Sequence, residues 1–472
     1  MLKFGNKGLI QSLNVLLILA AVNASAQLPK GVVLKEFYDT QKITFDNSFW
    51  FGEIPGKPGN FLVTARGGAM SLFNPAKGTK VAFGSIPVEG VAEAGLMGIA
   101  FHPDFVNNRR YFAYYSGKGL PDRLIIGEFK ADTSLLKDSG TPPKIIWQTT
   151  DIRSIIGAKL DHVGSSLVFG PGGYLYQGIG DNNTNGKYTQ SHTVVLGTVI
   201  RIDVDHPDPG RNYGIPHDNP FYNSPDTAVK QEIYAYGFRN PWKLHFDAVT
   251  NDLWVGNVGG WLMDYSHRIK LGENMGWPIT EGTFCFDARG TKFDHYPALA
   301  TCNRTGLSTP DVQFAHPDPM CDNCNGMIGG LVYRGSQFSQ FYGVYLTVDY
   351  VEKTIWGAKV KDGIMTPEAI GKSTVGLTHI TQDSQGNVYG IVWTTGKILR
   401  FDHAEFNKGP TTLAPQSKSA RPHGKLRVYS IGNVGFGANQ EVYDLHGKKL
   451  VLSSTESSAK QLVPGLYFLK GK

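Results

Sequence analysis

A turn of glycine, aspartate or asparagine followed by alternating apolar and aromatic residues recurs six times along this chain. The pattern occurs at residues 61–63, 111–114, 173–176, 251–255, 343–346 and 386–389. Such alternation predicts short strands bounded by tight turns. Six strands at intervals of roughly 45 to 90 residues predict propeller blades with insertions, since a compact blade takes about 40–50 residues. We therefore predict an all-β, six-bladed β-propeller.

The composition excludes several other classes of protein. The 472 residues include 57 glycines and 26 prolines, and only 18% of the residues are charged. Few charges and many turn formers argue against a coiled coil, a helical bundle and a disordered chain. The formal net charge is +6, and no run of lysine and arginine is dense enough to predict a nucleic-acid partner.

The first 26 residues have the features of a signal peptide. Lys3 and Lys7 precede an apolar run at 15–22, and Ala24–Ser25–Ala26 forms a small-residue cleavage site. The apolar run is too short to span a bilayer, and no other segment predicts a transmembrane span. We expect a secreted or cell-surface protein, with a periplasmic location or a retained N-terminal anchor as the alternatives.

All four cysteines lie close together in the sequence, at Cys285, Cys302, Cys321 and Cys324. After an export signal, this grouping favours two disulfides in one loop region, with three possible pairings. A zinc site is the alternative, because Cys321 and Cys324 have CxxC spacing. That site would need Cys285 and Cys302 as its other two ligands.

The chain changes character after residue 404, where the predicted propeller of residues 27–404 ends. Residues 405–424 combine prolines, serines and basic residues, as a linker does. Residues 425–472 contain alternating strands and turns, which predict a small C-terminal β-sandwich. Val442–Lys448 and Pro464–Lys470 resemble the sorting domain of type IX secretion cargo, which implies export by outer-membrane secretion machinery. An ordinary accessory domain is the alternative.

Residues 161–181 contain the most informative motif. They predict a strand, a tight turn at Pro171–Gly173 and a second strand. A hairpin brings its two open ends together, so we expect His162 and Asp181 to be neighbours. A histidine beside a carboxylate suits a general base, because the carboxylate fixes the tautomer and stabilises the imidazolium. A purely structural hydrogen bond is the alternative.

Two segments could offer oxygen ligands to a calcium ion. Asp181–Gly186 matches the first half of a calcium loop, but its twelfth position is His192 instead of glutamate, which favours a polar loop. Gly259, Gly260 and Asp264 could offer carbonyl and carboxylate oxygens to a hard cation. They could equally form a loop that connects blades.

Two further segments place polar groups near strand ends. Glu93 precedes a predicted strand, where its side chain could face a central channel. Arg239 and Asn240, which Pro241 follows, put a guanidinium and an amide at a strand end or loop. An arginine there can clamp a carboxylate or polarise a carbonyl oxygen, and a surface salt bridge is the alternative.

Taken in order, these motifs resemble the glucose/sorbosone dehydrogenase family over about residues 35 to 403. The segments that carry the resemblance are Gly95–Phe105, His162 with Phe169–Gly173 and Gly180–Asp181, Leu196–Gly197 with Arg201–Asp203, Asp218–Phe221, Tyr236–Gly237 with Arg239–Pro241, and Ile328–Gly330 with Tyr333–Gly335. The resemblance implies a six-bladed propeller that binds pyrroloquinoline quinone and calcium. It also implies that the protein oxidises a sugar substrate and passes the electrons to an external acceptor.

The resemblance implies roles for individual residues. His162 takes the proton from the sugar hydroxyl, Asp181 orients His162, and Arg239 stabilises negative charge on the quinone oxygen. The quinone carries three carboxylates, so further cations are expected around it. The cofactor-binding set is then Glu93, Asp161, Arg239, Asn240, Arg334 and Lys353, and the calcium site is Gly259, Gly260 and Asp264.

Four residues depart from the family pattern. Ser165 replaces a usual glycine, Phe238 a common histidine, Asn257 a usual aspartate of the calcium region, and Thr354 an arginine often found there. The changes at 257 and 354 weaken the calcium site and remove a cofactor cation. The lost cation at Thr354, together with family members that are binding proteins, favours a second hypothesis, a non-catalytic propeller that binds carbohydrate or protein at the cell surface. A zinc-stabilised interaction module, based on the cysteines, is a third.

Overall fold

The computed structural model describes residues 27–90, 93–118, 123–150, 160–286, 301–316, 326–361 and 364–403, and four strands after them. The chain divides into two units, Met1–Asn407 and Lys408–Lys472. The predicted signal peptide and the predicted linker lie outside the described residues. Within the described residues, no helix is long and apolar enough to cross a membrane.

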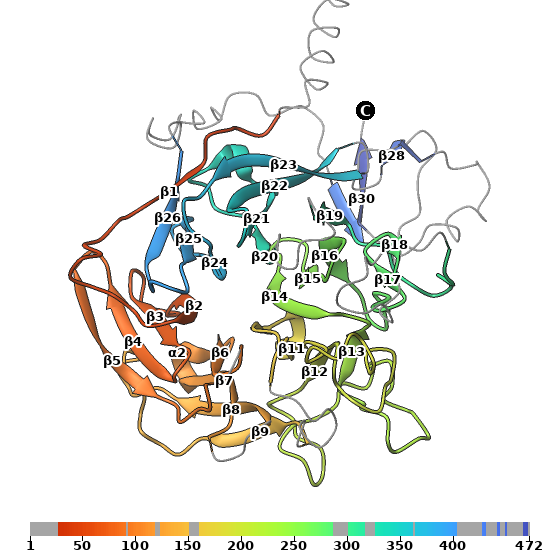
Figure 1. Cartoon of the computed structure of the whole chain (residues 1–472), viewed down its shortest axis with the longest axis horizontal. Coiled ribbons are helices and arrows are strands. Elements are labelled where there is room, and N and C mark those ends of the chain that lie inside the picture. The colour runs from red at the N-terminus through yellow and green to blue at the C-terminus, as the bar shows by residue number, and fades with distance from the viewer. Residues whose placement is uncertain are drawn as a thin grey trace, which may run out of the picture. The chain divides into compact units, whose positions relative to one another are not determined.

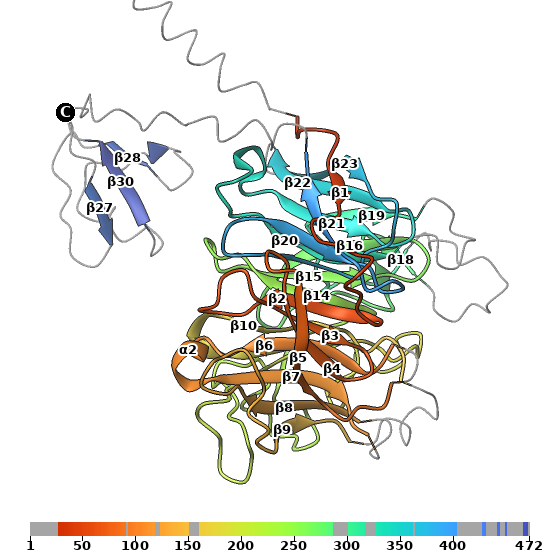
Figure 2. The same ribbon diagram turned by 90° about the vertical axis from the view of Figure 1, so that its left-hand side faces the viewer.

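The first unit contains six four-stranded antiparallel sheets arranged in a ring (Figure 1), which confirms the predicted propeller. In blades one to five, consecutive strands run from the centre of the ring to its rim; Figures 1 and 2 show this for β6 to β9. The strands of blades one to three are β2 (Ser48–Glu53), β3 (Phe61–Ala65), β4 (Ala69–Asn74) and β5 (Thr79–Ser85); β6 (Leu96–Phe101), β7 (Arg110–Ser116), β8 (Leu124–Lys130) and β9 (Lys144–Gln148); and β10 (Leu167–Phe169), β11 (Leu175–Ile179), β12 (Thr198–Ile202) and β13 (Ile233–Tyr236).

The first and last described strands of the ring close it. The inner three strands of blade six come from the end of the unit, and β1 from its beginning pairs with β26 as the outer strand, with Leu34 opposite Phe401. The strands of blades four to six are β14 (Asn240–Phe246), β15 (Leu253–Val258), β16 (Met263–Ile269) and β19 (Val312–Ala315); β20 (Met327–Val332), β21 (Tyr345–Asp349), β22 (Thr354–Lys361) and β23 (Ile364–Lys372); and β24 (His379–Gln382), β25 (Val388–Ile391), β26 (Ile398–Asp402) and β1 (Val33–Lys35).

The core lies between neighbouring blades. Each blade packs on the next, so both faces of most strands are buried; β7 is buried at every position except the first. Large side chains such as Phe61, Phe73, Tyr111 and Tyr345 are fully buried. Strands covered on both faces contain almost continuous apolar residues, which explains why their alternation in the sequence is incomplete. Helix is limited to α2 (Phe105–Asn108) and the 3₁₀ turns η1 (Pro171–Gly173) and η2 (Ser339–Phe341) within the described residues.

The predicted hairpin of blade three is present. Strands β10 and β11 pair with Leu167 opposite Gln177 and Phe169 opposite Leu175. The turn η1 connects them, and Gly172 and Gly173 both have a φ of +78°, a conformation that glycine adopts without a steric cost. The open ends of this hairpin therefore lie side by side.

The longest insertion carries a disulfide. Strands β17 (Thr280–Glu281) and β18 (Phe284–Cys285) form a small sheet of their own, and Cys285 is bonded to Cys302. Because both sulfurs are used in this bond, neither can complete a zinc site, and the zinc hypothesis is wrong. Cys321 and Cys324 lie outside the described residues.

The described strands of the second unit form one antiparallel sheet in the order β27, β30, β28, β29. Their bounds are Arg427–Ser430, Leu466–Lys470, Glu441–Tyr443 and Lys449–Leu450 in that order. The role of this unit in secretion stays a prediction.

Candidate active site

Most of the predicted site residues gather at one face of the ring, which we call the mouth. In every blade the inner strand begins at this face and the second strand ends there, because antiparallel neighbours reverse direction. His162 precedes β10 and Asp181 follows β11, while Glu93 precedes β6 and Arg239 precedes β14. Residues far apart in the sequence therefore meet at the mouth.

His162 and Asp181 are in contact. His162 Nδ1 lies 2.9 Å from Asp181 Oδ1, and the two side chains are 12% and 1% exposed. His162 has a φ of +43°, a left-handed conformation that costs a non-glycine residue free energy and clusters at functional sites. Among the described residues, none forms a hydrogen bond with His162 Nε2. That nitrogen is left for a ligand.

Three further donors hold the Asp181 carboxylate. The amides of Asn183 and Gly186 donate to it at 2.8 and 2.9 Å, and Trp277 Nε1 donates at 3.0 Å. Burial raises the pKa of Asp181, but the hydrogen bond and charge of His162, with the charge of Arg239, outweigh burial and lower the pKa overall. An ionised Asp181 keeps the imidazole proton on Nδ1, which leaves the Nε2 lone pair free to accept a proton.

Arg239 lies beside this pair. Its carbonyl oxygen accepts a hydrogen bond from the Asp181 amide at 2.7 Å, which joins blade three to blade four. Its guanidinium donates to the carbonyl oxygens of Val258 and Gly259 at 3.4 and 2.5 Å. No described carboxylate forms an ion pair with Arg239, so its charge is available to an anionic ligand.

Asn240, Glu93 and Asp161 connect the inner strands around the pair. Asn240 is 2% exposed; its Oδ1 accepts an amide hydrogen from the segment before β10, and its Nδ2 donates to Glu93 Oε2 at 3.4 Å. Asp161 Oδ1 accepts the His162 amide hydrogen at 3.1 Å. Burial raises the pKa of Glu93; the charge of His162 opposes the rise, Asp161 adds to it, and Arg239 opposes it. Titratable groups from three blades therefore act on one another at the mouth.

A cavity of 320 Å³ lies at the mouth, within the range of about 300–1,000 Å³ typical of small-molecule sites. Glu93 and Asn240 line it, and its other lining residues are mainly aromatic or aliphatic: Phe49, Trp242, Val258, Gly326, Ile328, Tyr350, Val351, Thr378 and Trp393. Trp393 Nε1 is buried and has no hydrogen-bond partner among the described residues. Aromatic walls, an orphaned N–H donor and the nearby Arg239 suit a flat, acidic aromatic ligand. These residues fit pyrroloquinoline quinone.

The predicted calcium residues meet at the mouth, but N–H donors occupy their oxygens. The Gly259 carbonyl oxygen accepts from Arg239, and the Asp264 carboxylate accepts the amides of Gly259 at 2.7 Å and Met327 at 2.9 Å. The Gly260 amide donates to a different carboxylate, that of Glu281. Calcium needs six to eight oxygens with lone pairs directed at the ion, so it does not fit this arrangement. Nor do the described residues contain three His, Cys, Asp or Glu side chains grouped to hold a metal.

The second calcium candidate, Asp181–Gly186, is a polar loop. Asn182, Asn183 and Asn185 have φ values of +52°, +56° and +51°, which turn the backbone amides back onto the Asp181 carboxylate. With its oxygens occupied in this way, Asp181 serves His162 rather than a cation.

The two remaining predicted cations lie at opposite ends of the blades. Arg334 follows β20 at the face away from the mouth, where it forms two hydrogen bonds with Asp247, at 2.7 and 2.6 Å. This position does not fit a shared site with His162. Lys353 lies in the turn between β21 and β22, on the mouth side, close in sequence to Tyr350 of the cavity wall.

The departures from the family pattern have structural explanations at three positions. Ser165 Oγ donates to the Trp242 carbonyl oxygen at 2.9 Å, and Asn257 Oδ1 accepts the amide of the first residue of β14 at 3.1 Å. Phe238 is fully buried in the core of blades three and four. Thr354 begins β22 and supplies no charge.

Three residues that received no role from the sequence also belong to the site. Trp277 donates to Asp181. Glu281 is 2% exposed; its Oε1 accepts the amides of the 260–261 turn, and its Oε2 is buried without a hydrogen-bond partner among the described residues. His316 Nε2 lies 3.3 Å from Asp264 Oδ1. All three lie on or beside the insertion of blade four, where no periodic pattern in the sequence indicates which side chains turn inward.

Two relatives show what this chain is similar to. The HIPL2 protein of Arabidopsis thaliana is 28% identical over 328 residues, which cover 60% of this chain and 45% of that protein. The aldose sugar dehydrogenase YliI of Escherichia coli is 29% identical over 240 residues, which cover 50% of this chain and 59% of that protein. The chain spans about half the length of the curated relatives it matches.

A solved structure and a family comparison agree with the fold. The PQQ-bound form of aldose sugar dehydrogenase from Streptomyces coelicolor matches with a TM-score of 0.58 and 20% identity, over 80% of this chain and 99% of that one. At this identity the likeness concerns the fold. The sequence model described as Glucose / Sorbosone dehydrogenase matches residues 49–400, from blade one to blade six. This chain belongs to the glucose/sorbosone dehydrogenase family.

Proposed function

We propose that this chain is a quinone-dependent dehydrogenase that oxidises a sugar hydroxyl, with the anomeric carbon of an aldose as the oxidised centre. The observation that carries the proposal is the His162–Asp181 pair at the mouth, 2.9 Å apart, beside a guanidinium with no carboxylate partner among the described residues. Family membership supports the same reaction class, and the aldose sugar dehydrogenase among the relatives supports the choice of substrate class.

His162 is the proposed general base. Nε2 accepts the proton of the sugar hydroxyl, which raises the electron density on that oxygen and helps the adjacent C–H bond to release its hydrogen as hydride. Asp181 holds Nδ1 and stabilises the imidazolium that forms. Its pKa is lowered because the contacts with His162 and Arg239 outweigh the effect of burial. Asp181 therefore remains ionised during the reaction.

Pyrroloquinoline quinone, when bound, supplies the two-electron acceptor for the hydride, and an external acceptor then takes the electrons. The aromatic side chains of Trp242 and Trp393 would hold the planar rings and exclude water. Arg239 and Lys353 would neutralise carboxylates of the quinone, and Arg239 would also stabilise negative charge on its reacting oxygen.

The test uses the purified full chain, the quinone, an artificial dye acceptor and a panel of aldoses. Removing a general base typically costs about 10²–10⁴-fold in rate, so we expect His162→Ala to lower kcat by that factor. His206→Ala is the matched control, because the His206 side chain is 86% exposed, and it should leave kcat within about twofold. Wild-type activity in His162→Ala would contradict the proposed base.

A second candidate function is the binding of carbohydrate or protein without catalysis. The small number of positive charges at the mouth favours this second function. Of the residues at positions 239, 334, 353 and 354, only Arg239 and Lys353 bring a charge to the mouth. A quinone with three carboxylates would then be held less tightly than in a site with a third cation. Sugar binding by a wild-type chain that takes up no quinone would favour this function over the first.

A further inference from the structure

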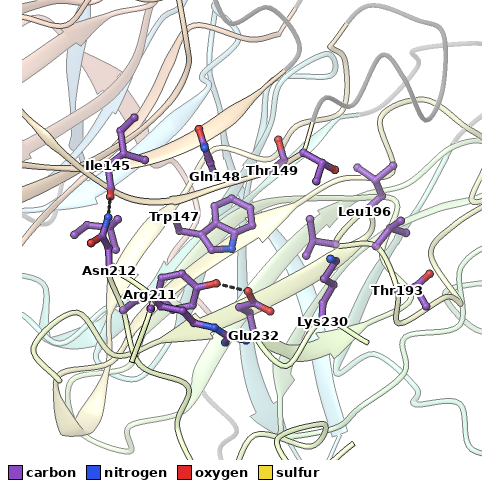
Figure 3. Close-up of a pocket in the computed structure, with 16 residues that line it drawn as sticks. Ile145, Trp147, Gln148, Thr149, Thr193, Leu196, Arg211, Asn212, Lys230 and Glu232 are labelled. Atoms are coloured by element: carbon purple, nitrogen blue, oxygen red, sulfur yellow. Dashed lines mark hydrogen bonds between the residues drawn. The ribbon is translucent and has the colours of Figure 1, made fainter. Parts of the chain in front are cut away.

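A second cavity lies between blade two and blade three (Figure 3). Its volume is 570 Å³, against 320 Å³ at the mouth, and no residue lines both cavities. Blade two contributes residues 145–150, from β9 and the two positions after it. Blade three contributes residues 193–196, 210–213, 230 and 232. The cavity is separate from the candidate active site and large enough for a small molecule.

Glu232 is a buried acid in the wall of this cavity. It is 8% exposed, and Tyr213 donates its phenolic hydrogen to Oε1 (dashed line in Figure 3). Burial raises the pKa of Tyr213, and the charge of Glu232 raises it further, so this tyrosine remains a donor. No described residue donates to Glu232 Oε2. That oxygen is therefore open to a donor from a ligand or from water.

Two donors face the same space. Lys230 forms no ion pair with a described carboxylate, and Trp147 Nε1 has no acceptor in the described part of the chain. Figure 3 shows the Trp147 indole nitrogen on the side of the ring toward Glu232. One acceptor and two donors from two blades therefore line the same cavity.

The rest of the wall indicates the class of ligand. Gln148 and Thr193 add neutral polar groups, and Val194 and Leu196 add apolar surface. A sugar hydroxyl both donates and accepts hydrogen bonds, and sugar C–H groups pack on apolar surface. An anion would meet the Glu232 carboxylate, and a cation would meet Lys230 and the neighbouring arginine. We propose that this cavity binds a neutral saccharide, independently of the quinone and of the mouth.

The experiment titrates the full chain, without quinone, with glucose and with cellobiose by calorimetry. Glu232→Gln keeps an acceptor for Tyr213 but removes the charge, and Lys230→Met removes the ammonium while keeping the length of the side chain. We expect each variant to raise Kd for at least one probe by tenfold or more. Glu368→Gln, at a surface ion pair on β23, is the matched control and should leave Kd within twofold.

Two further measurements separate this proposal from the proposed function. Thermal unfolding shows that each variant is folded, and the rate of sugar oxidation should be unchanged in Glu232→Gln. Wild-type protein that binds neither probe would overturn the proposal. So would wild-type affinity in both folded variants, or loss of all binding in His162→Ala, because that result assigns the sugar to the mouth alone.

Discussion

Asp181 shows how the surroundings of one residue link charge to stability. Its folded-state pKa is below the ordinary value of about 3.9. Its contribution to stability is therefore fully present above the ordinary value and is lost as the pH falls through the lowered one. We expect Asp181→Asn to flatten the fall in free energy of unfolding between about pH 5 and pH 2, measured by urea unfolding. Asp46→Asn, at an exposed position, is the control and should leave the dependence of the free energy of unfolding on pH as in the wild type. An unchanged pH dependence in Asp181→Asn would contradict the stabilising role of the Asp181 carboxylate.

For individual residues of the candidate site, the sequence predicts some contacts and misses others. His162 and Asp181 flank the two strands of one hairpin, so their meeting follows from the local pattern alone. Arg334 also stands at a strand end, but the end of an inner strand lies at the face away from the mouth, and a local pattern does not show that β20 is the inner strand of its blade. The inward turn of Glu281 depends on the path of an insertion, which carries no periodic signal.

The β10–β11 hairpin positions His162 through close backbone packing. A Cβ at Gly180 would clash with the His162 carbonyl oxygen, whereas a Cβ at Gly67 would meet nothing within 4 Å. We expect Gly180→Ala to cost about 1–3 kcal/mol of stability and to lower kcat of the folded protein, because the His162 backbone must shift. Gly67→Ala should change the free energy of unfolding by less than about 0.5 kcal/mol. Denaturant unfolding and kinetics on the same samples check both, and a fully active Gly180→Ala would contradict the packing argument.

The closure of the ring depends on β1, which comes before blade one in the sequence and completes blade six. Val32, just before β1, is 2% exposed, and Val33, the first residue of β1, is 39% exposed. Serine at a buried position loses apolar contacts and buries a hydroxyl, so Val32→Ser should lower the free energy of unfolding by about 2 kcal/mol. Val33→Ser should have an effect within about 0.5 kcal/mol. Equal effects of the two substitutions in thermal or urea unfolding would contradict the burial of Val32 at the closure.

The recurring strand pattern predicts the number of blades, because each blade contributes one strongly apolar strand after a turn. It does not predict the closing strand, since Val33–Lys35 is three residues long and its partner lies more than 360 residues away. Pairing at that separation comes from the geometry of the whole ring, which a local pattern does not contain.

The most direct measurement of the central claim, that the mouth holds a redox quinone beside His162, is an absorbance titration of the full chain with pyrroloquinoline quinone, followed by an aldose. We predict saturable uptake of one quinone per chain in both wild type and His162→Ala. On addition of the sugar, the bound quinone should be reduced in the wild type and remain oxidised in the variant. Absence of saturable uptake, or equally fast reduction in both proteins, would contradict the claim.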